Sequence, residues 1–120
     1  MKRIFQPPKL EDQYYDARWL KKHFNVEISE GMIKFLGAVD AAENAYDFVS
    51  MRQFYVEHKK ENLSSYYFAS VDKKHSKWRL PIEMLNENDE VVEPTDNEIE
   101  FLKGIKKIRI RGMSEHYGEY

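Results

Sequence analysis

The apolar positions in the first half of the chain recur at helical spacing. Tyr15 and Trp19 are four residues apart, which predicts one helix over residues 10–24. Ser29 is a good N-cap, and the apolar residues that follow it between residues 32 and 45 predict a second helix. The first half of the chain is therefore expected to be mainly helical.

The second half changes to the alternating pattern of strands. The even-numbered apolar residues from Trp78 to Met84 face one side, while Arg79 and Glu83 face the other. Pro81 has no N–H, so this strand is expected to lie at a sheet edge there or to be irregular. The other predicted strands are residues 2–5, a strand beginning within residues 51–56, residues 66–71 and residues 105–111.

Helices followed by a run of strands predict an α+β fold, in which N-terminal helices pack on one face of a mainly antiparallel twisted sheet. The 120 residues are expected to form a single domain, residues 1–120. The sheet face away from the helices would carry Arg79 and the trio Lys107, Arg109 and Arg111. That face is therefore predicted to be basic.

Charge is distributed unevenly along the chain although the net charge is only −2. Residues 81–104 contain one basic and eight acidic side chains, whereas residues 51–80 contain seven basic and three acidic ones. The acidic stretch, residues 86–98, predicts an exposed loop between two strands. It either serves solubility or, because it would repel phosphates, lies away from a polyanion-binding face.

Composition excludes several classes of site. The chain has no cysteine, which rules out a disulfide scaffold, a thiol nucleophile and a thiolate zinc site. Its four histidines show no metal-ligand spacing, so neither a metal nor a cofactor is expected. No apolar run approaches the roughly 18 residues that span a bilayer, and the basic start lacks the apolar region of a signal peptide. We therefore expect a cytoplasmic protein with no membrane contact.

Four segments, in order, carry a resemblance to a known family. They are residues 36–48, which end a helix with an Asp-Ala-Ala run, residues 58–67, residues 75–83 with their Trp-Arg-Leu strand, and residues 105–118 with a His-Tyr-Gly ending. Together they resemble the HigB-like toxins of the RelE/ParE superfamily, also called plasmid-maintenance killer proteins. The resemblance implies a small cytoplasmic endoribonuclease that cuts mRNA on the ribosome. It also implies a helix-turn-helix antitoxin as partner, bound in a hetero-oligomer.

The resemblance assigns catalytic roles to four residues. His116 matches the family's C-terminal general acid or base, Arg79 matches the arginine that holds the scissile phosphate, and His58 and Lys60 correspond to a loop histidine and lysine. The chain departs from the family at two places. Ser114 and Glu115 stand where the family often has Asp-Tyr before the histidine, and Glu61 replaces a glycine.

Metal-free RNA cleavage requires few groups. The 2′-hydroxyl loses a proton, the leaving 5′-oxygen gains one, and the phosphate gathers negative charge, so a histidine and a fixed guanidinium are sufficient. The predicted RNA contacts are Lys59, Lys77, Lys107, Arg109 and Arg111. The alternative interpretation of Lys107, Arg109 and Arg111 is a solvated strand face, and that of Lys77 is a residue of a hairpin loop.

The sequence leaves two other functions possible. The same fold without catalysis would resemble ParE-like relatives, which bind a protein target such as DNA gyrase. The third reading is an unrelated small protein that binds a partner through its acidic loop. The first function predicts that His116→Ala and Arg79→Ala abolish activity and leave the fold intact. The second predicts that they have no effect, and the third predicts no toxicity.

Overall fold

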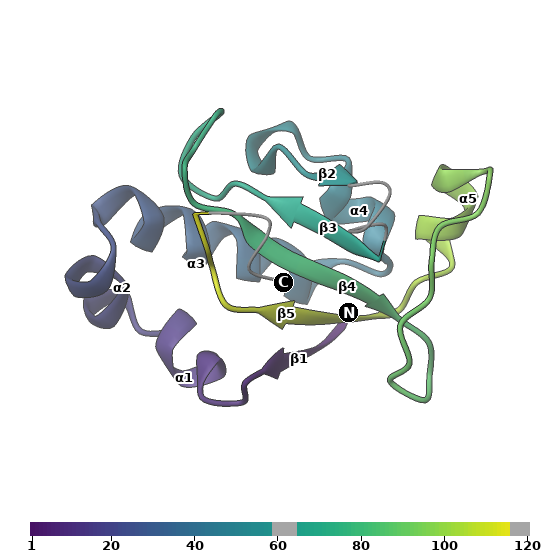
Figure 1. The fold of residues 1–120 in the computed structure, drawn as a ribbon, viewed down its shortest axis with the longest axis horizontal. Coiled ribbons are helices and arrows are strands. Elements are labelled where there is room, and N and C mark those ends of the chain that lie inside the picture. Colours follow the sequence, from purple (N-terminus) through teal and green to yellow (C-terminus); the bar gives the residue numbers. More distant parts are fainter. Residues whose placement is uncertain (59–64, 116–120) are drawn as a thin grey trace.

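The computed structural model describes residues 1–58 and 65–115, in which five strands form one sheet in the order β1-β5-β4-β3-β2 (Figure 1). The strands are β1 (Lys2–Gln6), β2 (Glu57–His58), β3 (Tyr66–Ala69), β4 (Leu80–Leu85) and β5 (Lys107–Arg111). The helices are α1 (Leu10–Tyr14), α2 (Ala17–His23), α3 (Val26–Ala41), α4 (Ala45–Val49) and α5 (Glu98–Lys103), with a 3₁₀ turn, η1 (Arg52–Phe54).

The sheet is mixed. Strands β2 to β5 pair antiparallel with their neighbours, while β1 lies parallel to β5 at one edge. Figure 1 shows α3 crossing behind the sheet, α1 beside β1, and α2 beside α3. The predicted α+β class is confirmed, and the antiparallel order holds everywhere except at β1. A parallel neighbour needs a long crossover, which the helices and the central strands together supply.

The predicted helix over residues 10–24 is wrong in one respect, because it is two helices. Asp16 interrupts it: its side chain accepts hydrogen bonds from the backbone N–H groups of Arg18 and Trp19 and so caps a new helix, α2. A short acidic side chain at an N-cap satisfies donors that a continuous helix would bond internally. The chain therefore turns between α1 and α2.

The second predicted helix begins earlier than expected. Asn25, not Ser29, is the N-cap of α3, because its side chain accepts from the backbone N–H of Ile28 at 2.7 Å. Ser29 lies inside the helix, buried, and its hydroxyl donates to the carbonyl of Ala17. That bond ties α3 to α2. The prediction of Ser29 as a cap was therefore wrong.

The expected strand start within residues 51–56 is not observed, because Arg52–Phe54 form the 3₁₀ turn η1. Tyr55 follows the turn in the left-handed region, with φ 46°, which reverses the chain before β2. Within the described residues, His58 then pairs with Tyr67 and Glu57 with Phe68 of β3. The predicted strand over residues 66–71 is confirmed as β3, although pairing ends at Ala69.

Pro81 lies in the interior of the sheet, so its predicted edge position was wrong. Strand β4 is the middle strand, and Pro81 pairs with Phe68 of β3. The expected irregularity is present on the side of β4 that pairs with β5. The β4–β5 ladder ends at Ile82 opposite Ile110 and resumes at a bridge between Arg79 and Ser114, one residue out of register. A missing N–H accounts for the interruption of that ladder.

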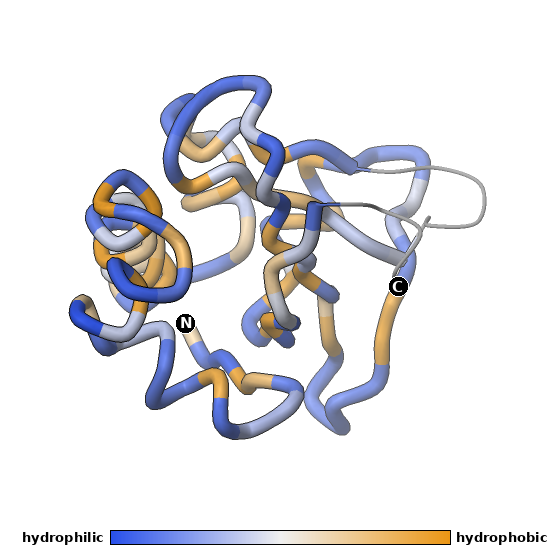
Figure 2. Tube along the Cα trace, turned by 60° about the vertical axis from the view of Figure 1, so that its left-hand side comes forward, coloured by the Kyte–Doolittle hydropathy of each residue, from blue (hydrophilic) through white to orange (hydrophobic). Residues whose placement is uncertain are grey.

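The main core lies between the sheet and the helices. From the sheet it takes the alternating residues predicted to face inward, and α3 supplies the largest helical share. Figure 2 shows that apolar and polar residues also alternate along the turns of the helices. Gly31 of α3 is buried against the backbone carbonyl of Val71, in the segment after β3, and leaves no room there for a Cβ. The fully buried core residues include Leu20, Ile28, Met32, Phe35, Phe48, Ile82, Met84, Ile108 and Ile110.

The acidic stretch does not connect two strands directly. After β4 the chain reverses at Asn86, whose side chain accepts from the backbone N–H groups of Asn88 and Glu90. Val91 then pairs back with Leu85, and Asn97 caps α5, a helix that the sequence pattern did not predict. Among the residues that the structure describes, no helix is long and apolar enough to cross a membrane.

Candidate functional site

The sheet face opposite the helices, here called the open face, carries a charged cluster at its centre. Glu83 of β4 lies between Tyr66 of β3 and Arg109 of β5 in the pairing register. Alternation along β5 places Lys107 and Arg111 on the same side as Arg109. The predicted basic strand face is therefore present, but an acidic residue lies inside it.

Glu83 is the most deeply buried charge of this cluster. Its side chain is 8% exposed, and its Oε1 accepts from Nη1 of Arg111 at 3.0 Å and from Nη1 of Arg109 at 3.4 Å. The two arginine side chains are 36% and 21% exposed. A charge this buried needs partners because desolvation is costly, and here one carboxylate oxygen has two.

The acidic segment before α5 folds back onto the same face. Asp89 lies 2.5 Å from Nζ of Lys107, and its backbone carbonyl accepts from Nη2 of Arg109 at 3.1 Å. Asp89 has φ 62°, which completes the reversal that begins at Asn86. Of the two interpretations of this acidic stretch, its placement away from the basic face therefore does not hold for Asp89. Asp89 and Lys107 are 18 residues apart in the chain, and the reversal at Asn86 brings their opposite charges together.

Tyr66 belongs to this cluster, although sequence reasoning had treated it only as a strand residue. Burial raises the pKa of its hydroxyl first, the charge of Glu83 raises it further, and Arg111 and Arg109 lower it. The phenol is therefore neutral at physiological pH. Its place opposite Glu83 follows from the strand register, which the sequence alone did not supply.

Arg79 lies at one end of the open face, next to the chain that leaves β5. Its backbone exchanges two hydrogen bonds with Ser114, at 2.8 and 3.0 Å, and its Nη1 donates to the carbonyl of Trp78 at 3.4 Å. Lys77, 70% exposed, lies 4.0 Å from Glu115. The backbone of Arg79 is thus held next to Ser114, two residues before position 116 in the sequence.

Three of the predicted site residues, Lys59, Lys60 and His116, lie outside the described residues. His58 is described, and the structure does not bring it to the open face. Its ring stacks on Tyr67, a residue of the helix-side core, with ring centroids 4.6 Å apart. Its Nδ1 lies 3.7 Å from Oε1 of Glu98.

Tyr67 anchors that second cluster. Its hydroxyl donates to Oε1 of Glu98 at 2.7 Å, so β3 holds the first residue of α5. Burial, and then the bond and the charge of Glu98, raise the pKa of Tyr67 far above its ordinary value. The hydroxyl is thus a permanent hydrogen-bond donor, and its contact with α5 is structural.

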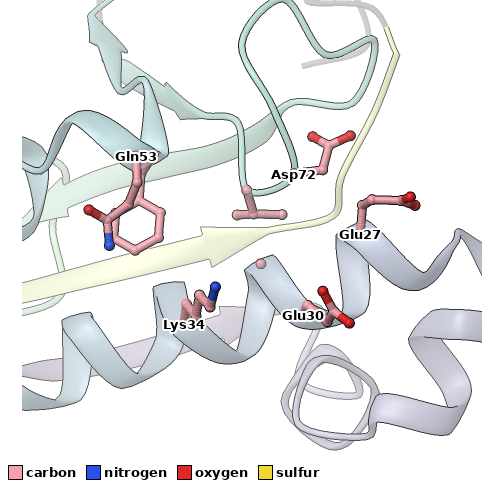
Figure 3. Close-up of a pocket in the computed structure, with 8 residues that line it drawn as sticks. Glu27, Glu30, Lys34, Gln53 and Asp72 are labelled. Carbon is pink, nitrogen blue, oxygen red and sulfur yellow. The ribbon is translucent and has the colours of Figure 1, made fainter.

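A small cavity of about 200 Å³ lies between α3, η1 and the segment after β3 (Figure 3). Its charged lining residues are Glu27, Glu30, Lys34 and Asp72, and Oδ1 of Asp72 is buried with no hydrogen-bond partner among the described residues. In Figure 3 the charged ends point in different directions. Within residues 1–58 and 65–115, no group of three or more His, Asp or Glu side chains is arranged to hold a metal ion.

A larger groove of about 1040 Å³ lies where β1 and β5 begin, against the segment that precedes α5. Its lining includes the apolar Leu85, Val92 and Phe101, with Lys106 and Glu93 among its charged residues. An apolar hollow with a polar rim is typical of binding sites for ligands or peptides. No nucleophile–base pair suggests catalysis in its described lining.

Comparison of the chain with protein-family models, with curated proteins and with solved structures found no match. The open face is therefore interpreted from its own residues. It offers guanidinium groups at two places: Arg79 beside the segment Ser114–Glu115, and Arg109 with Arg111 around Glu83.

Proposed function

We propose that this chain is a metal-free endoribonuclease of the toxin class, with an arrangement like that of HigB-like toxins of the RelE/ParE superfamily. It would cut mRNA on the ribosome, in the cytoplasm, and be neutralised by a helix-turn-helix antitoxin. The observation that supports this most is the pairing of Arg79 with Ser114. It brings the arginine to the segment that continues directly into His116.

The chemistry assigned to these residues is phosphoryl transfer to the neighbouring 2′-hydroxyl. Arg79 would hold the scissile phosphate and stabilise its developing charge, because a guanidinium stays protonated and donates in a fork. His116 would take or supply a proton, as an imidazole with a pKa near neutrality can. Arg111, 36% exposed on the same face, would contact a neighbouring phosphate.

Purified protein incubated with a 5′-labelled mRNA, with and without translating ribosomes, tests the proposal. Arg79→Ala and His116→Ala should each reduce the cleavage rate at least about 100-fold, the usual size of a lost proton-transfer or charge-stabilising group. Matched controls are Arg18→Ala and His23→Ala, which remove exposed residues of α2 on the helix side. These should cleave at the wild-type rate.

Two results would contradict the nuclease. One is intact RNA under both conditions with a folded wild-type protein, and the other is equal cleavage by all four variants, which indicates a contaminant. Induction of the same variants in bacteria adds a functional measurement. Growth arrest by the wild type should be relieved by Arg79→Ala and by His116→Ala.

One alternative has its own support. Ion pairs to Glu83 and Asp89 offset the charges of Lys107, Arg109 and Arg111, and the apolar groove near α5 suits a protein partner. A non-catalytic relative that binds a protein target such as DNA gyrase would have these properties. It predicts growth arrest that persists in Arg79→Ala and His116→Ala but is lost in Phe101→Asp.

A further inference from the structure

Glu83 has a burial that strand alternation alone does not explain. It is on the sheet face without the helices, where polar side chains normally contact water, yet its side chain is only 8% exposed. Two arginines of β5, Arg109 and Arg111, both donate to the same oxygen of Glu83. A single surface ion pair would be exposed and of little energetic value, whereas this carboxylate lies beneath two guanidinium groups.

The geometry gives Glu83 two effects on the arginines. First, it fixes their Nη1 atoms at one point, and the carbonyl of Asp89 holds Arg109 at Nη2 as well, so the two heads lie side by side. Second, its negative charge offsets one of their two positive charges. A phosphate that approaches the arginines would meet them aligned but would also feel the carboxylate beneath them.

We propose that Glu83 is a positioning residue and internal counter-ion that aligns Arg109 and Arg111 and limits the affinity of the open face for single-stranded RNA phosphates. The identity of the ligand rests on the proposed function. The alignment rests on the distances alone. Glu83 does not touch the reacting atoms, so it sets how tightly RNA binds rather than which bond breaks.

The substitution Glu83→Gln separates charge from hydrogen bonding. Glutamine keeps an oxygen at the same position to accept from both arginines but removes the negative charge. Glu27→Gln is the matched control, since it removes one negative charge from an exposed position on α3, behind the other face of the sheet. Arg111→Gln is the opposite change, because it removes one positive charge and leaves Glu83 paired with Arg109.

Binding is measured by fluorescence anisotropy with a labelled 12-nucleotide oligouridylate at several KCl concentrations, on the full chain, with thermal melts of each variant. Glu83→Gln should bind about threefold to tenfold more tightly at low salt than the wild type. The slope of log affinity against log salt should steepen by about 0.7, the value for one more neutralised phosphate of a single strand. Arg111→Gln should do the reverse, and the double variant should return close to the wild type.

A purely structural role would lower the melting temperature without changing the salt slope. Equal affinities and slopes for Glu83→Gln and Glu27→Gln would therefore overturn the inference, as would weaker binding by Glu83→Gln at an unchanged melting temperature. Tighter binding by Glu83→Gln together with a wild type that never cleaves RNA would support the role of Glu83 and remove the nuclease alone. Absence of RNA binding by every variant would overturn both.

Discussion

Gly31→Ala tests the packing of α3 against the segment after β3, because this is the closest backbone approach at any described glycine. A Cβ built on Gly31 would lie 1.7 Å from the carbonyl oxygen of Val71 and 2.5 Å from its carbon. Contacts below 3.0 Å are essentially never found for a real Cβ, so helix and segment would have to separate by at least 1.3 Å. The obstacle is backbone, which has no rotamer to change.

The cost of that separation follows from what it opens. Met32 and Phe35, on the same helix, are fully buried and would lose contacts as α3 moves. Overpacking in a close-packed core costs about 1–3 kcal/mol, and we expect the upper end, about 3 kcal/mol, because the clash is with backbone. In a domain of this size each kcal/mol changes the melting temperature by roughly 3–6 °C. Gly31→Ala should therefore melt about 9–18 °C below the wild type.

Gly37→Ala is the control, in the same helix and with the same chemical change. A Cβ at Gly37 meets nothing within 4 Å, and the residue is exposed. Alanine in place of an exposed helical glycine gains about 0.5–1 kcal/mol, so this variant should be more stable than the wild type. Urea unfolding followed by tryptophan fluorescence, with thermal melts by circular dichroism, measures both. A Gly31→Ala variant as stable as Gly37→Ala would refute this description of the interface.

Two further changes probe how single side chains hold the elements in place. Tyr67→Phe removes the 2.7 Å bond to Glu98 and should lower the free energy of unfolding by about 1 kcal/mol in urea titrations at pH 7. The pKa of Tyr67 is raised in the folded protein, so its contribution to stability is fully present below about pH 10 and is lost as the pH rises further. The difference in unfolding free energy between wild type and Tyr67→Phe should therefore shrink in titrations above about pH 10. A constant difference would contradict the assignment. Asn25→Ala removes the cap of α3 and should cost about 1 kcal/mol by the same measurement, whereas an unchanged unfolding midpoint would show that the Ile28 N–H finds another acceptor.

Alternation was sufficient to predict the two strands on which the candidate site lies. In β5 the residues of one parity, Ile108 and Ile110, are fully buried, and Arg109 and Arg111 lie on the other side. A strand with one buried face cannot shift by one residue without exposing its apolar set, so the pattern defines the faces. The break at Asp16 escaped the same reasoning, because a side chain that bonds the backbone locally competes with a continuous helix.

The local sequence gives the charges of the open face but not how they are paired. Strand alternation places Glu83 and the β5 cations on one face, yet only the register shows that Glu83 lies opposite Arg109. The position of Asp89 depends on the turn after β4, which places its carboxylate next to Lys107, a residue 18 positions later in the chain. Each such pairing lowers the charge available to a polyanion at the centre of the sheet. RNA would consequently meet the least competition from Glu83 and Asp89 at the other end of the face, where Arg79 lies and Lys77 is 70% exposed. Arg79 pairs there with Ser114, two residues before His116 in the sequence.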